Sequence, residues 1–218
     1  ERNFSVPLIL PKALKVISSM LPRKLIATNF SLKQSTLNIF EKMWNISKHK
    51  KPIFRKKLIV EEHCANGVSC EWLYKSIEQK DRVIFYLHGG AYLSGGLSAA
   101  RNRSMRYPVN TTASLFVVDY RTSAVGPYPA ALEDSFSAYK YLLSIAPNAE
   151  IIIIGDSAGG GLALATILKV LEAGLTSPSR MILNSPWTDL TCSSETYKTK
   201  QESDVVLEGI FLKKCATL

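Results

Sequence analysis

The residues that could carry chemistry begin with a serine between two glycines. The hydroxyl of serine becomes a nucleophile once a base takes its proton, and here it stands in the run Gly155-Asp156-Ser157-Ala158-Gly159. Four isoleucines precede this run, and residues 158–173 after it have the composition of a helix that ends at Gly174. Gly-x-Ser-x-Gly between a buried strand and a helix is the pattern of a nucleophile elbow. The sequence therefore predicts Ser157 as the nucleophile of an acyl-transfer reaction.

The residues next to Ser157 have their own expected roles. In a tight strand-to-helix turn, side chains at 155 and 159 would collide with backbone, which explains Gly155 and Gly159 and leaves Asp156 as a supporting residue. The amide of Ala158, first in the helix, should point to where an oxyanion would form. The alternative, an incidental glycine-rich turn, is disfavoured by the strand and helix on either side.

A second glycine pair follows an earlier apolar run. After Val83–Leu87 the chain reads His88-Gly89-Gly90-Ala91-Tyr92. Two adjacent glycines let backbone N–H groups approach a substrate carbonyl, so Gly89 and Gly90 are predicted to complete an oxyanion hole with Ala158. His88 is interpreted as a structural hydrogen-bonding residue of this loop rather than as a general base.

The elements that must hold these residues form an alternating series. Strand-like segments at 58–60 and 68–74 flank Asn66-Gly67, a strong hairpin signal. Four short apolar runs, at 83–87, 115–118, 151–154 and 181–183, read as strands buried on both faces, and helices are expected over 130–145 and 158–173. The pattern predicts an α/β fold with a doubly wound, mostly parallel sheet opened by an antiparallel hairpin.

The charge is concentrated at one end of the chain. The 218 residues carry a net charge of +9, and residues 1–57 contain 13 Lys and Arg against two acidic residues. We expect a solvated basic segment, and the alternative is contact with an anionic membrane surface. Nucleic acid is disfavoured because no nucleic-acid motif accompanies the charge. Apolar spacing over 7–44 predicts helices, so residues 1–54 are expected to form a helical cap and residues 55–218 the α/β core.

Cysteine and sequon positions bear on metal binding and on the cellular compartment. The four cysteines form no Cys-x-x-Cys pair and show no metal-ligand spacing with the three histidines, so no metal site is predicted. The Asn-x-Ser/Thr sequons at Asn3, Asn29, Asn45, Asn102 and Asn110 exceed chance and suggest the lumen of the endoplasmic reticulum. The compartment stays open, with the cytoplasm favoured.

These motifs together resemble one family. In order and spacing the chain is similar to the hormone-sensitive-lipase-like carboxylesterases of the α/β-hydrolase fold over about residues 55–200. The matching stretches are His88–Tyr92, Val118–Arg121, Tyr128–Asp134, Gly155–Gly160 and Ser185–Leu190. The resemblance implies hydrolysis of short- or medium-chain esters or lactones without a cofactor. It also implies Ser157 as nucleophile, and Gly89, Gly90 and Ala158 as oxyanion donors.

The resemblance also predicts parts that the sequence does not contain. Family members place an acid and then a histidine after the nucleophile, but no histidine follows Ser157, and Asp189 and Asp204 come too early for the acid. We therefore expect a fragment of a chain of roughly 300 residues, inactive as it stands, lacking the last strands and entering a second cap segment at 200–218. Its apolar sheet edge should be uncovered.

Two other functions stay open beside a serine esterase. One is a catalytically dead hydrolase-fold protein that binds a small molecule, as the plant gibberellin receptors do. The other is a lipid enzyme of the membrane surface, for which the basic segment is the support.

Overall fold

The computed structural model describes residues 57–200, 203–204, 207 and 209–217. The expected helices at 7–44, and with them the cap at 1–54, lie outside the described residues, so that division of the chain stays a prediction. The described residues fall into two compact units, 57–188 and 189–217.

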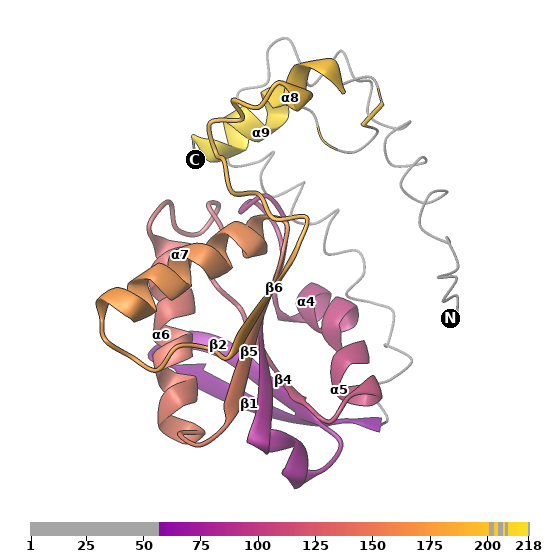
Figure 1. The fold of residues 1–218 in the computed structure, drawn as a ribbon, viewed down its shortest axis with the longest axis vertical. Coiled ribbons are helices and arrows are strands. Elements are labelled where there is room, and N and C mark those ends of the chain that lie inside the picture. Colours follow the sequence, from indigo (N-terminus) through magenta and orange to yellow (C-terminus); the bar gives the residue numbers. More distant parts are fainter. Residues whose placement is uncertain (1–56, 201–202, 205–206, 208, 218) are drawn as a thin grey trace. The chain divides into compact units, whose positions relative to one another are not determined.

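Within residues 57–188, six strands form one sheet in the order β1-β2-β4-β3-β5-β6 (Figure 1). Strands β1 and β2 are joined at Asn66-Gly67 as an antiparallel hairpin, β2 pairs antiparallel with β4, and the remaining pairs are parallel. The predicted mixed sheet is therefore confirmed. The strands are Ile59–Ala65, Val68–Tyr74, Arg82–Leu87, Ser114–Val118, Glu150–Asp156 and Arg180–Asn184.

Helices cover both faces of this sheet. Figure 1 shows α6 (Ala130–Ile145) and α7 (Ala158–Glu172) on one face, and α4 (Leu97–Ser104) and α5 (Arg106–Asn110) on the other. A short 3-10 helix, Ile77–Asp81, leads into β3. The α6 bounds are those expected from the sequence, and the chain turns at Gly174, with a φ of 63°, just beyond α7.

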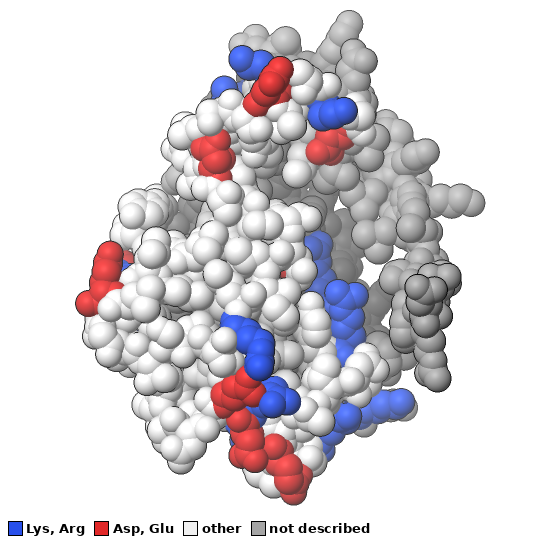
Figure 2. Space-filling model, viewed as in Figure 1, with Lys and Arg blue, Asp and Glu red and all other residues white. Residues whose placement is uncertain are grey.

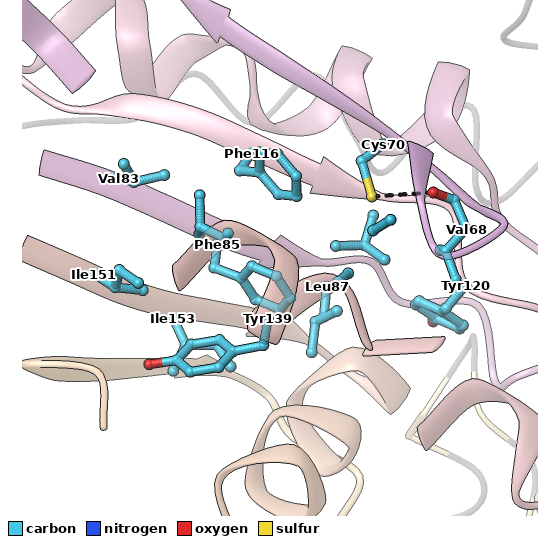
Figure 3. Packing of buried hydrophobic residues seen from close by; sticks show 14 of the residues in the cluster. Val68, Cys70, Val83, Phe85, Leu87, Phe116, Tyr120, Tyr139, Ile151 and Ile153 are labelled. Carbon is cyan, nitrogen blue, oxygen red and sulfur yellow. Dashed lines mark hydrogen bonds between the residues drawn. The ribbon is translucent and has the colours of Figure 1, made fainter. Parts of the chain in front are cut away.

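Apolar side chains pack on each face of the sheet. The larger cluster lies beneath α6 and α7, where Phe85 stacks on Phe116 with ring centroids 6.2 Å apart and meets Tyr139 edge-on at 5.4 Å (Figure 3). A smaller cluster lies beneath α4 and α5 and contains Ile84 and Tyr86. Because successive residues of β3 point to opposite faces, this strand supplies both clusters.

Strand β6 differs from the expected doubly buried strand. Met181 and Ile182 are 40% and 46% exposed, whereas β3, β4 and most of β5 are buried. Among the described strands β6 pairs with β5 alone, so its other edge has no neighbour to exclude water. The surface over α7 bears little charge, while basic side chains gather over α4 and α5 (Figure 2). An uncovered apolar edge was expected from the sequence, but full burial of the run 181–183 was wrong.

The described part of unit 189–217 contains two helices, α8 (Thr196–Thr199) and α9 (Gly209–Ala216). Leu207 and Ile210 are exposed. Leu212 and Cys215 are buried instead, three residues apart on one helical face. Among the described helices, none has the length and apolar character needed to cross a bilayer.

Candidate active site

The predicted site residues meet at the carboxyl edge of the sheet. His88 follows β3, Ser157 follows β5 and Ser185 follows β6, and these three strands are parallel neighbours. Strand β3 lies between β4 and β5 in the sheet. The chain therefore passes from β3 to β4 on one side of β3 and then crosses to form β5 on its other side. Such a reversal of strand order is where ligands bind in open α/β sheets, at the carboxyl ends of the strands.

Ser157 forms the turn between β5 and α7 in a strained backbone conformation. Its φ is 53° and its ψ is −118°, values that a residue with a side chain rarely adopts. The backbone is fixed on both sides: the Ser157 N–H donates to Asn184 O at 2.9 Å, and Ser157 O accepts from the N–H of Trp187 at 2.9 Å. The strain is thus compensated by hydrogen bonds to the segment that ends β6.

Backbone packing around the turn explains its glycines. A methyl group on Gly155 would lie 2.3 Å from Gly159 O, and one on Gly159 would lie 2.2 Å from Leu87 O. The next two positions are equally confined, because a methyl on Gly160 would lie 2.7 Å from Pro186 Cβ and one on Gly161 2.3 Å from Trp187 O. Each contact is far inside van der Waals distance, so the turn must be built from glycine.

The loop after β3 runs beside the serine in left-handed turns. A methyl group on Gly89 would lie 3.1 Å from Ser157 Cβ, and Gly90, Ala91 and Tyr92 all have positive φ, of 144°, 53° and 60°. In the part of the chain that the structure describes, the amides of Gly89, Gly90 and Ala158 donate no hydrogen bond. Gly89 therefore packs against Ser157, and Ala158 follows it directly in the chain.

Aromatic residues flank this arrangement. The Tyr92 and Trp187 rings have centroids 6.1 Å apart, and the Tyr92 hydroxyl oxygen lies 3.3 Å from where a methyl on Gly161 would stand. Burial raises the pKa of Tyr92 to about 12, so the phenol stays neutral. Tyr92 belongs to the loop after β3 and Trp187 to the segment after β6, and both residues lie close to Gly161, which follows the turn at Ser157.

His88 lies inside the loop, as a neutral imidazole. It is 2% exposed, stacks on Tyr120 at 4.1 Å between ring centroids, and its backbone oxygen accepts from the Tyr120 hydroxyl at 2.5 Å. Its Nδ1 lies 3.1 Å from Gly89 O, and because a carbonyl only accepts, Nδ1 carries the proton. Burial lowers the pKa of His88 to about 4, against the opposing effect of this bond to Gly89.

A stability change with pH follows from this burial. The folded pKa of about 4 lies below the usual 6.5, so between these values the unfolded chain binds more protons. We expect the free energy of unfolding to fall as pH drops through this window, by at most about 1.4 kcal/mol per pH unit from this one proton. Urea unfolding at several pH values should give a shallower slope for His88→Phe than for wild type. Equal slopes would contradict the expectation.

Reasoning from the sequence missed two residues of the site, Tyr86 and Asn184, which both contact Asp156. Asp156 accepts hydrogen bonds from the Tyr86 hydroxyl at 2.5 Å and from Asn184 Nδ2 at 2.7 Å. The available signal was position: both donors stand near the carboxyl ends of strands that neighbour β5. Recognising them requires the strand order, because Asn184 pairs with Asp156 only once β6 lies beside β5.

Neither imidazole of the described residues meets Ser157 as a base. His63 lies in β1 with Nδ1 3.1 Å from the Tyr141 hydroxyl, and His88 has the contacts given above. In the other unit, the Asp189 carboxylate accepts hydrogen bonds from Thr191 and Ser193 of its own turn, and these bonds lower the pKa of Asp189. In the described residues, no group of three or more His, Cys, Asp or Glu side chains is placed to hold a metal ion.

A family model described as alpha/beta hydrolase fold matches residues 84–215. An acetyl-hydrolase of Streptomyces hygroscopicus is 33% identical over 155 residues, which are 71% of this chain and 50% of the relative. An esterase of Acinetobacter venetianus is 38% identical over 128 residues, 58% of this chain and 42% of the relative. The chain thus spans about half the length of these curated relatives or less.

Solved structures give the same match. The crystal structure of EstE5 soaked with ethyl alcohol superposes with a TM-score of 0.79 at 30% identity, covering 94% of this chain and 67% of that one. An esterase from the bacterial hormone-sensitive lipase family superposes with a TM-score of 0.75 at 27% identity, again covering 94% of this chain and 67% of that one.

Among the curated relatives matched by sequence, the mouse hormone-sensitive lipase is 26% identical over 140 residues, 62% of this chain and 18% of that lipase.

Proposed function

Because the chain belongs to the α/β-hydrolase fold family, in its hormone-sensitive-lipase-like esterase group, we propose that the protein hydrolyses carboxylic esters through an acyl-enzyme on Ser157. The observation that carries the proposal is the backbone of Ser157, held at a φ of 53° with the loop at Gly89 packed against it. Its relatives include acetyl-hydrolases and esterases, which supports a small-molecule ester with a short or medium acyl group.

The proposed reaction has two balanced steps. Ser157 Oγ attacks the ester carbonyl carbon, the carbonyl oxygen takes the negative charge, and the alcohol leaves with the proton lost by the serine. Water then attacks the acyl-serine and releases the carboxylic acid and the free hydroxyl. In both steps Gly89, Gly90 and Ala158 would donate their N–H groups to the oxyanion. No cofactor enters either step.

The proton of Ser157 needs a base that the two described imidazoles do not supply. We propose that the base comes from outside the described residues. In the esterases that this chain resembles, the base comes after the nucleophile, and residues 158–218 contain no histidine. We therefore expect residues 1–218 expressed alone to have a serine that is positioned but not activated.

A fluorophosphonate probe, which reports activated serines, tests this proposal. The protein in its natural length should be labelled at Ser157 in a one-to-one ratio, as read by peptide mass spectrometry, and residues 1–218 alone should be labelled far more slowly. Rapid labelling of residues 1–218 would show that a base lies within them. A natural-length protein that resists the probe, yet binds small acids, would favour the alternative of a binding protein.

A further inference from the structure

The carboxylate next to the proposed nucleophile is held by side chains from two other strands. Tyr86 of β3 donates to Asp156 Oδ2 at 2.5 Å, and Asn184 of β6 donates to Asp156 Oδ1 at 2.7 Å. We propose that these three side chains, the Asp156 clamp, are positioning residues that keep Ser157 in its reactive geometry. The inference rests on the proposed ester hydrolysis.

The clamp needs an acceptor between two donors. The Tyr86 side chain is 1% exposed, and burial, followed by the hydrogen bond to Asp156, raises its pKa far above the usual value, so its hydroxyl keeps the proton and donates. The Asn184 amide offers Nδ2, which also only donates. A carboxylate accepts at both oxygens and satisfies both donors at once. Arg103, Tyr107 and His88 are the other charged or titratable groups close to this cluster.

Asn184 makes hydrogen bonds to the turn at Ser157 with both its side chain and its backbone. Its side chain binds Asp156, and its backbone oxygen accepts from the N–H of Ser157 at 2.9 Å. In the β5–β6 ladder Asn184 stands opposite Asp156, so both bonds depend on one strand register. Position 184 therefore fixes residues 156 and 157 together.

This geometry bears on reactivity because the serine is strained. A residue at positive φ relaxes when its surroundings let it, and the Ser157 hydroxyl would then shift relative to the Ala158 amide. A misplacement of about 1 Å can cost about 100-fold in rate. The clamp opposes that relaxation from strands β3 and β6, on either side of β5.

Asn184→Asp is the sharpest test, because it turns a donor into a second carboxylate facing Asp156. At about pH 8 we expect kcat for p-nitrophenyl butyrate to fall about tenfold or more, with a smaller change in KM. Two facing carboxylates come to share one proton as pH falls, so the ratio of variant to wild-type kcat should rise towards about pH 5.5. A change that was only structural would leave that ratio independent of pH.

The double variant Asp156→Asn/Asn184→Asp supplies the rescue. It exchanges donor and acceptor: the new amide accepts from Tyr86 through its oxygen and donates to the new carboxylate. We expect kcat to return to within about threefold of wild type. Asn148→Asp makes the same chemical change at an exposed turn after α6 and should leave kcat unchanged.

These measurements use the protein in its natural length, with unfolding temperatures as the check on folding. A wild-type kcat for Asn184→Asp at every pH, or a loss that the double variant does not recover, would overturn the clamp. If the double variant does not fold, Tyr86→Phe is the deciding test. An unchanged kcat in Tyr86→Phe would also overturn the proposed role of the Asp156 clamp. The proposed ester hydrolysis fails separately, when wild-type activity persists in Ser157→Ala.

Discussion

Ser157→Ala is expected to abolish ester hydrolysis, with kcat for a short p-nitrophenyl ester falling by about 10⁵–10⁶. Without the hydroxyl no acyl-enzyme can form, and the three amides beside the turn stabilise only whatever direct attack by water occurs. The fold should be retained, because the hydrogen bonds of position 157 are made by its backbone. Steady-state kinetics on the natural-length protein are the measurement.

Ser177→Ala is the matched control for that loss. Ser177 lies exposed in the loop after α7, and the same atom is removed there without touching the turn. We expect wild-type kinetics from this variant. If Ser157→Ala kept more than a few per cent of wild-type activity, the nucleophile would be another residue and the proposed mechanism would be wrong.

Gly90→Ala is expected to lower kcat by about 10²–10³, the cost of losing one oxyanion donor. The added methyl group would stand 1.9 Å from Ser94 O, and Gly90 has a φ of 144°, so the loop must move and take its amide with it. KM should change far less than kcat, because the lost interaction belongs to the transition state.

The hairpin turn provides the control for this backbone effect. Gly67 has a φ of 91° with no atom within 4 Å of an added methyl, so Gly67→Ala carries a similar conformational cost in open space. It should lower stability without changing kcat. A Gly90→Ala protein altered only in KM would mean that the loop binds substrate without stabilising the oxyanion.

Local patterns predicted much of this fold. Apolar runs located the parallel strands, Asn66-Gly67 located the hairpin, and helical spacing located α6. These signals succeed because strand, turn and helix preferences act within a few residues. The glycine at 159 was also predictable, since a turn from strand to helix leaves little room around it.

The errors came from interactions between distant segments. The exposure of Ile182 depends on which strand lies beside β6, and no periodicity within the run 181–183 encodes that neighbour. The contacts of Asp156 likewise depend on register, since its partners are 70 residues before it and 28 residues after it.

The close packing of backbone around the turn limits how this protein can change during evolution or engineering. Gly155, Gly159, Gly160 and Gly161 each abut a different neighbour, so no single one can gain a side chain without moving another segment. Insertions or deletions there would break all of these contacts together. Mutant libraries aimed at new substrates should therefore keep these four codons fixed. Diversity belongs at positions such as 92 and 187, whose side chains flank the turn.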